Sequence, residues 1–309
     1  MIKIVAGRLL QLIPVLWIIL TLTFFMSKSV PGGPFSAERQ ATPETIARLN
    51  AYYGLDKPLW EQYVNYLANV VRFDFGPSYT YQGESVNEVI GRSFPISFEI
   101  GTLAFVISLV LGIPAGVIAA ANRNKLLDYL PMSLSMLGIC LPTFVLGPIL
   151  ALVFGLIFKI APVSGWYGLN YVPLPPAVMP ALTLGLFYAA YIARLARGGM
   201  LDILNQDFIR TARAKGVPEH EIIVKHALRG GLLPIAAFLG PAFAGLLTGS
   251  FVLEKVFNIP GIGQEFIKSV FNRDYPLIMG TVAFFGVLIV VFNLLSDVLQ
   301  AWMDPKSRT

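Results

Sequence analysis

The chain has 309 residues, of which 55% are hydrophobic and only 13% are charged. Soluble domains carry about 25% charged residues, so this composition excludes an ordinary soluble protein and indicates a membrane protein. The formal net charge is +5, but no basic stripe with interleaved aromatic residues accompanies it, and we expect no nucleic-acid partner. The single cysteine, Cys140, excludes an internal disulfide; because it lies in an apolar run, we expect it to be packed there.

Six uncharged apolar stretches are long enough to cross a bilayer as helices, which takes about 20 residues each. They span residues 9–27, 100–121, 131–158, 174–193, 230–253 and 275–296. The first is too long for the apolar part of a secretory signal, and no small-residue cleavage site follows it, so we expect it to remain in the mature protein. The predicted fold class is an all-α membrane protein with six transmembrane helices.

The distribution of Lys and Arg predicts the orientation, because short cytoplasmic segments are enriched in these residues. One side of the predicted membrane carries Lys3, Arg8, Arg123, Lys125, seven more between residues 194 and 229, Lys306 and Arg308. The short segments of the other side carry Lys159, Lys255, Lys268 and Arg273. Both termini are therefore expected in the cytoplasm, and the long segment 31–99 is expected to face outward.

The outward segment contains two predicted helices. In 42–55, Thr42 is a candidate N-cap, Pro43 suits the first helical position and Gly54 is a stop signal. Residues 57–76 show apolar residues at helical spacing, which indicates an amphipathic helix. Its aromatic residues Trp60, Tyr63 and Tyr66 are expected at the membrane interface, where such rings are enriched.

The six stretches contain no Lys, Arg, Asp or Glu. Ion-coupled carriers place such groups within the membrane to bind the coupling ion, so any transport is expected to draw its energy from elsewhere. Seven prolines at membrane depth are compatible with ordinary kinked helices and also with a bundle that surrounds a passage. No GxxxxGK[ST] motif occurs, and His220 and His226 have no cysteine beside them, so we expect no bound nucleotide, metal or other cofactor.

Residues 194–229 form the most basic of the predicted cytoplasmic segments. Helix-forming residues run through 202–215, with Asp202 or Asn205 as a candidate cap, and Gly216 is placed to end this helix in a left-handed turn. Pro218 suits the first position of a second helix. The small Ala212 and Ala214 lie beside cations, as on a surface that a partner approaches closely; a loop that binds lipid headgroups is the alternative.

The sequence FIRTARAKG-VPEHEIIVKHALRGGLLP (208–234) resembles the cytoplasmic coupling loop of binding-protein-dependent ABC importer permeases. The general motif is Glu-Ala-Ala, three residues, Gly, nine residues, Ile-x-Leu-Pro. Ala212, Gly216 and Leu228 match it, whereas His226 and Arg229 stand in place of Ile and Pro. These departures disfavour a sugar permease and are typical of peptide permeases. The residues assigned to coupling through this resemblance are Arg210, Thr211, Ala212, Arg213, Ala214, Lys215, Gly216, His226 and Leu228.

Further segments along the chain are similar to the first permease subunit of oligopeptide importers. They include RLLQLIPVLWIILTLTFF (8–25), PGGPFSAER (31–39), FDFGPSYTY (73–81), GIPAGVIAA (112–120), NIPGIGQEF (258–266), NRDYPLI (272–278) and DVLQAWMDPKSR (297–308). The resemblance implies a first transmembrane helix in 1–30, an outward segment in 31–99, and a transporter core in 100–309 with its coupling loop at 194–229. It also implies a multi-pass protein of the bacterial inner membrane.

The partners implied are a second, homologous permease subunit, two ATPase subunits that bind the ATP, an extracytoplasmic peptide-binding protein, and the peptide itself. Import of dipeptides, nickel or glutathione by the same kind of complex remains open, and the sequence identifies no substrate-contacting residue. Outside the family, the alternatives are a self-sufficient secondary transporter, an intramembrane hydrolase and a receptor. The absence of ionisable groups from the six stretches disfavours the first two.

Overall fold

The computed structural model describes residues 2–29, 43–166 and 173–303, and throughout these ranges the chain consists of helices and their connections. Extended pairing within them is limited to one isolated antiparallel bridge between Pro77 and Ser85. The all-α fold class is therefore confirmed.

Four helices of the described part are long and apolar enough to cross a membrane. They are α4 (Val86–Ala121), α7 (Val178–Leu204), α11 (Leu233–Leu247) together with α12 (Phe251–Val256), and α14 (Tyr275–Met303). A fifth is added if α5 (Leu126–Cys140) forms one bent span with α6 (Thr143–Leu150) and η1 (Ala151–Ile157). In α1 (Ile2–Ser29), the apolar part Ile13–Ser29 is shorter. The count of six spans and their orientation remain predictions.

Capping, rather than hydrophobicity, sets where α4 begins. The Ser85 hydroxyl accepts a hydrogen bond from the Glu88 N–H at 3.2 Å, and the Glu88 carboxylate accepts one from the Ser85 N–H at 2.7 Å. This reciprocal capping box starts the helix at Val86. The charged residues before position 100, which limited the predicted span, therefore lie within the helix. α7 is likewise longer than its apolar stretch and continues to Leu204.

The stretch 131–158, predicted as one span, is broken. The axes of α5 and of α6 with η1 meet at 106°. Pro142 lies at the break and has no N–H to donate to the carbonyl of Gly138, so the α5 hydrogen-bond ladder cannot continue through it. Cys140, at the end of α5, is exposed in this single chain, so the expectation that it is packed was wrong.

Helices α4 and α7 pack closely because α4 presents glycines to α7. A Cβ on Gly112 would lie 2.7 Å from the Ala189 carbonyl oxygen, and one on Gly116 would collide with the Ala193 carbonyl. Small residues four apart allow membrane helices to approach in this way. The buried core of the bundle lies along this contact and extends to α11, where Gly101 of α4 faces Leu246.

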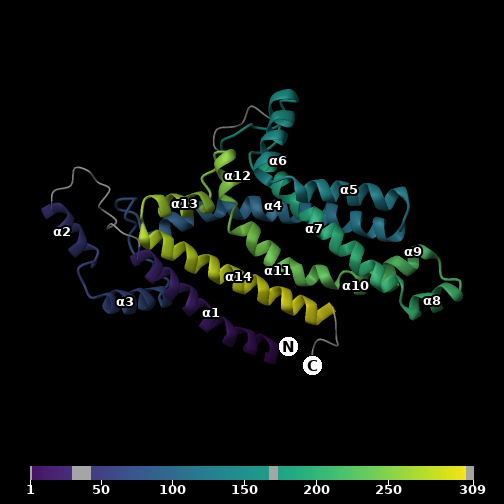
Figure 1. Ribbon diagram of the computed structural model, residues 1–309, viewed down its shortest axis with the longest axis horizontal. Coiled ribbons are helices and arrows are strands. Elements are labelled where there is room, and N and C mark those ends of the chain that lie inside the picture. The colour runs from purple at the N-terminus through teal and green to yellow at the C-terminus, as the bar shows by residue number, and fades with distance from the viewer. Residues whose placement is uncertain (1, 30–42, 167–172, 304–309) are drawn as a thin grey trace.

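The spanning helices run side by side, and shorter helices gather at their two ends (Figure 1). At one end lie α2 (Pro43–Tyr52), α3 (Leu59–Val71) and α13 (Ile262–Phe271). At the other lie α8 (Asp207–Ala214), α9 (Glu219–Glu221), η2 (Ile222–Ala227) and α10 (Leu228–Gly231). The segment predicted to be outward and the segment predicted to be cytoplasmic are thus at opposite ends.

Both helices of the outward segment are present, but the second is shorter than the expected 57–76 and ends at Val71. α2 begins at Pro43, and Gly54, with φ +64°, follows its end; the candidate cap Thr42 lies outside the described residues. In α3, Trp60 is exposed, but Tyr63 and Tyr66 contact the ring of Phe24 at centroid distances of 5.3 and 5.8 Å. These two tyrosines therefore attach α3 to α1 rather than standing free at the interface.

Candidate functional site

The segment predicted to couple the protein to a partner is a compact helical corner at the end of α7. α7 ends at Leu204 and α8 starts at Asp207 after Gln206, which makes no side-chain cap. The prediction of one helix over 202–215 capped by Asp202 or Asn205 is therefore wrong. Ile209 of α8 is fully buried in an apolar cluster with Met200 and other residues of α7 and η2, and this contact fixes α8 to the bundle.

Gly216 makes the turn that follows α8. Its φ is +79°, and its N–H bonds to the Arg213 carbonyl at 3.0 Å while the Val217 N–H bonds to the Ala212 carbonyl at 3.2 Å. A Cβ at Gly216 would meet no heavy atom within 4 Å, so glycine is required by the backbone conformation and not by space. This confirms the left-handed turn expected from the sequence. Pro218 precedes α9 as its N-cap instead of occupying its first position.

An ion pair spans this turn. Arg213 donates to the Glu219 carboxylate through Nη2 at 2.6 Å and through Nε at 3.1 Å. The hydrogen bonds from Arg213 hold the pKa of the Glu219 carboxyl below its usual range. Both side chains are about half exposed, so the pair contributes at most about 1 kcal/mol to stability. It orients α9 relative to α8.

The structure divides the predicted coupling residues between two faces. The exposed ones are Arg210, Thr211, Arg213, Ala214, Lys215, Gly216 and His226. Leu228 is partly buried, and Ala212 is only 9% exposed, in the same apolar cluster as Ile209. Ala212 therefore does not belong to the surface that a partner meets, contrary to the expectation. It lies three residues after Ile209, which places both on the inward face of α8.

Phe208 is a surface feature of α8 that the sequence analysis did not identify. Its side chain is 51% exposed on a short helix rich in charge, beside the exposed Arg210 and Thr211. Aromatic and arginine side chains are the residue types that most often dominate binding energy at protein interfaces. The signal available in the sequence was an aromatic residue within a basic cytoplasmic segment.

Two polar contacts join helices near the corner. Arg197 of α7 makes a two-pronged ion pair with the buried Asp128 of α5, at 2.6 and 2.8 Å. Arg229 of α10 donates to the Trp302 carbonyl of α14 at 3.3 Å. The first contact joins α7 to α5, and the second joins α10 to α14.

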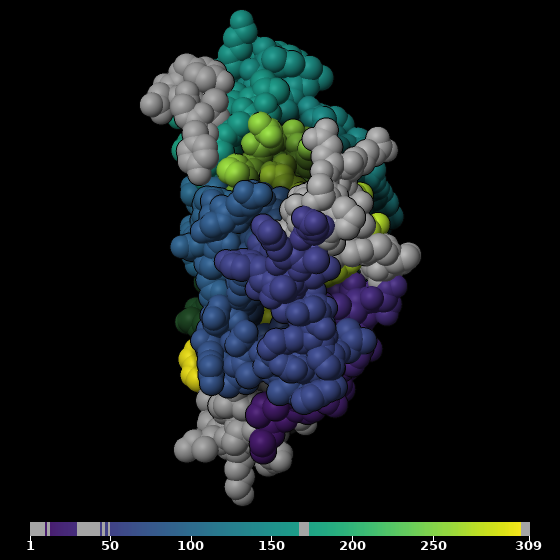
Figure 2. All heavy atoms as spheres, turned by 90° about the vertical axis from the view of Figure 1, so that its left-hand side faces the viewer, coloured from purple at the N-terminus to yellow at the C-terminus, as the bar shows by residue number. Residues whose placement is uncertain are grey.

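At the opposite end, two of the quoted sequence motifs meet at Asp274. Its carboxylate accepts hydrogen bonds from the Ser78 hydroxyl at 2.5 Å and from the backbone N–H groups of Thr80 and Leu277 at 3.0 and 3.2 Å. Residues 73–81 are thus fixed to the start of α14. Viewed from this end, the N-terminal third of the chain covers the centre of the face, with the α12–α13 region beside it (Figure 2).

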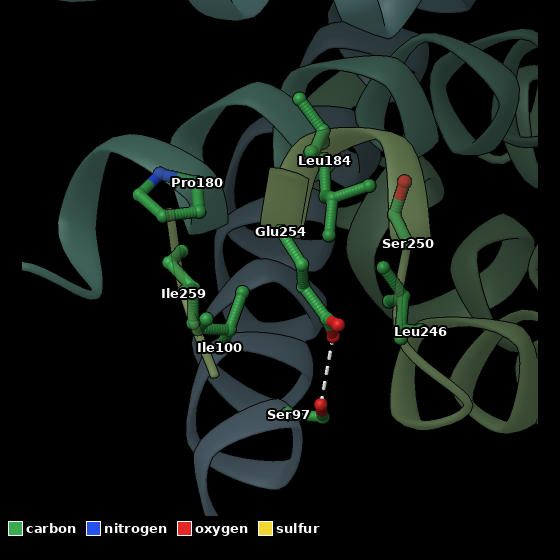
Figure 3. Close-up of a pocket in the computed structure, with 10 residues that line it drawn as sticks. Ser97, Ile100, Pro180, Leu184, Leu246, Ser250, Glu254 and Ile259 are labelled. Atoms are coloured by element: carbon green, nitrogen blue, oxygen red, sulfur yellow. Dashed lines mark hydrogen bonds between the residues drawn. The ribbon is translucent and has the colours of Figure 1, made fainter. Parts of the chain in front are cut away.

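Glu254 forms a buried junction near this end, although sequence analysis assigned it no role. Only 3% exposed, it accepts hydrogen bonds from the Ser97 hydroxyl at 2.8 Å and from the Gln264 N–H at 2.7 Å. The Ser97 oxygen in turn accepts from the Ile262 N–H at 2.9 Å. Apolar side chains of α4, α7 and α11 surround the carboxylate (Figure 3). A buried carboxylate requires such partners, and here they join α4, α12 and α13.

Glycines make room for the Glu254 carboxylate. A Cβ on Gly249 or Gly261 would collide with its Oε1 atom, and one on Gly263 would lie 3.1 Å from Oε2. The GIG sequence at 261–263 is therefore explained by close packing at the start of α13. No group of His, Cys, Asp and Glu able to hold a metal ion occurs among the described residues.

Family models identify the chain. A model of the N-terminal part of binding-protein-dependent transport system membrane components matches residues 1–105, and the model of the binding-protein-dependent transport system inner membrane component matches residues 112–309. The chain belongs to this family. It is a transport component of the bacterial inner membrane and not an enzyme. As a member of binding-protein-dependent systems, it acts together with a binding protein and an ATPase.

Relatives with curated names extend over the full length of the chain. The oligopeptide transport system permease protein OppB of Haemophilus influenzae is 44% identical over 308 residues, which is 100% of both chains. The dipeptide transport system permease protein DppB of Bacillus subtilis is 46% identical over 291 residues, covering 94% of this chain and 93% of the relative. The family expected from the coupling-loop sequence is therefore confirmed.

Solved structures support the fold. A chain of the MetNI methionine ABC transporter in an inward-facing conformation matches with a TM-score of 0.54 and 16% identity, covering 70% of this chain and 96% of that one. A chain of an amino acid ABC transporter matches with a TM-score of 0.53 and 16% identity, covering 70% of this chain and 94% of that one. At this identity the likeness concerns the fold of an ABC importer permease.

Proposed function

We propose that this permease forms half of the translocation pathway of an oligopeptide importer, together with a second, homologous permease subunit. In this proposal six spans cross the membrane, both termini are cytoplasmic, and residues 31–99 face the binding protein. Two ATPase subunits bind the ATP, and this chain has no cofactor of its own. The names of the full-length OppB relatives support oligopeptides as the cargo, and the distribution of Lys and Arg supports the proposed orientation.

The exposed corner at the end of α7 is the observation that carries the coupling role. The surface of α8 that bears Phe208, Arg210 and Thr211 is free in this chain, while Ile209 and Ala212 hold its other face to α7. Docking of the exposed face in a groove of the ATPase would bury Phe208, and full burial of such a side chain stabilises a contact by about 1.5–3 kcal/mol. Closure of the ATPase pair would then move α8 and, through its buried face, α7.

Phe208 provides the test. We expect Phe208→Ala to reduce recovery of the ATPase with the affinity-tagged permease by about tenfold or more, because truncation of an interface anchor costs about 2 kcal/mol or more. Leu126→Ala is the matched control, since Leu126 is a 76% exposed apolar residue at the start of α5, outside the corner. Recovery of the ATPase with Phe208→Ala at the level of the unmodified complex would contradict the assignment.

A dipeptide cargo is the second candidate, supported by the 46% identical DppB relative. The two candidates differ in the length of the peptide that enters the vesicle. Reconstituted complexes with their cognate binding protein should accumulate labelled tetra- and pentapeptides under the oligopeptide proposal. Accumulation of dipeptides alone would favour the alternative.

A further inference from the structure

A cavity lies apart from the coupling corner, at a place where two breaks in the spanning helices lie beside α7. It measures about 440 Å³, a size in the range of small-ligand sites. The break between α5 and α6 supplies one wall, α7 supplies the second, and the connection from α11 to α12 supplies the third. Its main lining residues are Thr143, Phe144, Phe187, Tyr188, Gly245 and Ser250.

Three hydroxyl groups in this lining have no hydrogen-bond partner within the described ranges 2–29, 43–166 and 173–303. They are those of Thr143, Tyr188 and Ser250, all partly buried. The Ser250 hydroxyl points away from the Glu254 carboxylate, so it takes no part in that junction (Figure 3). Polar groups at membrane depth require partners, and partnerless hydroxyls on a concave wall indicate that a polar occupant supplies them.

The backbone around the cavity is also irregular. Pro142 interrupts the α5 ladder, and Gly249, with φ +79°, follows the end of α11. Non-helical backbone at membrane depth occurs where protein buries it or where it lines a water-filled space. Gly245 keeps the cavity open, because a Cβ there would lie 3.0 Å from the Tyr188 hydroxyl oxygen. The two breaks and this glycine therefore place exposed polar groups around one space.

We propose that this cavity is a subsite for the peptide in transit, which it holds by main-chain amides of an extended segment. The inference rests on the proposed function and adds a location for the cargo. Hydroxyls both donate and accept, so they match the N–H and C=O groups of any peptide unit. The lining contains no Lys, Arg, Asp or Glu, so it does not select the cargo by charge. Phe144 and Phe187 offer apolar area to side chains of varied shape.

Filling the cavity is the first arm of the test. Gly245→Leu should reduce peptide uptake by about tenfold or more, because a pocket of this size holds one short segment, while ATPase stimulation by loaded binding protein persists. Gly91→Leu is the matched control, since a Cβ at Gly91 meets no atom within 4 Å and Gly91 lies outside the cavity. Uptake by Gly245→Leu equal to that of the control would overturn the subsite. Absent stimulation in the unmodified complex would instead count against the proposed function.

Trapping of the cargo is the second arm, and it does not depend on the stability of Gly245→Leu. Ser250→Cys is introduced with Cys140→Ser, and the probe is a pentapeptide whose cysteine carries a 2-thiopyridyl disulfide. The introduced thiol should form a mixed disulfide with the peptide, releasing 2-thiopyridone, only with ATP and binding protein present. Leu137→Cys, at a 58% exposed position of α5, should not react. An unreactive Ser250→Cys, or one that cross-links to the second permease and never to peptide, would overturn the proposal.

Discussion

Arg213 and Glu219 form a two-pronged ion pair across the turn at Gly216, with N–O distances of 2.6 and 3.1 Å. The pair closes the corner between α8 and α9 on its exposed side, while Ile209 and Ile222 close it on the buried side. The orientation of α8 is therefore set by both a polar and an apolar contact.

The Arg213–Glu219 ion pair should contribute only a little to the stability of the fold at neutral pH. The pKa of Glu219 is lower in the folded state than in the unfolded state. The ion pair therefore stabilises the fold at pH values above the unfolded-state pKa, and this stabilisation is lost as the pH falls through the folded-state pKa. Glu219→Gln should thus reduce thermal stability at pH 7 by about 1 kcal/mol or less, and the difference from the unmodified protein should vanish in acid. Thermal unfolding of the detergent-solubilised complex, measured in steps from pH 7 down to pH values below the lowered folded pKa, tests this. A difference that grows toward acid would contradict the sign of the shift.

Ala212 and Ala214 should respond differently to the same substitution, although both lie on α8. Ala212→Asp places an unpaired carboxylate in the apolar cluster, so we expect α8 to detach and the amount of intact complex in the membrane to fall severalfold. Ala214→Asp, at an exposed position, should leave that amount unchanged. Immunoblots of membranes and limited proteolysis at residues 204–218 measure the two outcomes. Equal expression and equal protease resistance would show that Ala212 is not buried in the assembled protein.

Glu254 should be a stability determinant rather than a transport group. Glu254→Ala removes the acceptor of the Ser97 hydroxyl and the Gln264 N–H, and a buried group left unpaired costs about 1–3 kcal/mol. Glu254→Gln retains one acceptor oxygen and should lose less. Glu61→Gln is the control, at a partly exposed α3 position where the carboxylate pairs with Lys57. Melting temperatures of the purified complexes should fall in the order control, Gln variant, Ala variant, and an unchanged Ala variant would exclude this role.

The proposed orientation makes the two ends of the bundle distinguishable in intact cells. With Cys140→Ser as background, Asn65→Cys on α3 should react with an impermeant thiol reagent added from outside, and His220→Cys on α9 should react only after permeabilisation. Both positions are exposed in this chain, and the comparison of sealed with permeabilised cells isolates the contribution of the membrane. Labelling of His220→Cys and not of Asn65→Cys in sealed cells would reverse the orientation.

Local signals in the sequence predicted the helix ends at Gly216 and Gly54, because a helix end with a left-handed turn is determined by a few neighbouring residues. The inward position of Ala212 could not be read locally, since it depends on the break at Asn205 and on packing against α7. Glu254 was missed because it directly follows an apolar stretch, where a charge is expected at the surface. Its partner Ser97 lies 157 residues away, and no local pattern connects them.

Proline alone also did not predict the break in the stretch 131–158. Pro114 lies within α4 and Pro148 within α6 without ending either helix, whereas Pro142 lies at the 106° bend. Membrane helices tolerate proline where other groups satisfy the freed carbonyl, so the residue type alone does not locate a break. The same break forms one wall of the proposed peptide subsite, so that subsite could not be located from the sequence either.

The most direct test of the account is ATPase stimulation by peptide-loaded binding protein in vesicles that contain the complex with Gly216→Val. A β-branched residue at φ +79° costs about 1–2 kcal/mol in the left-handed region, so α8 should be misdirected while the spans, which do not contact Gly216, remain assembled. Gly216→Asn is the control, because asparagine tolerates this conformation, and it should retain most of the stimulation. We predict that Gly216→Val reaches the membrane with the second permease but shows no stimulation and no peptide uptake. Full stimulation in Gly216→Val would contradict the assignment of this corner as the coupling element.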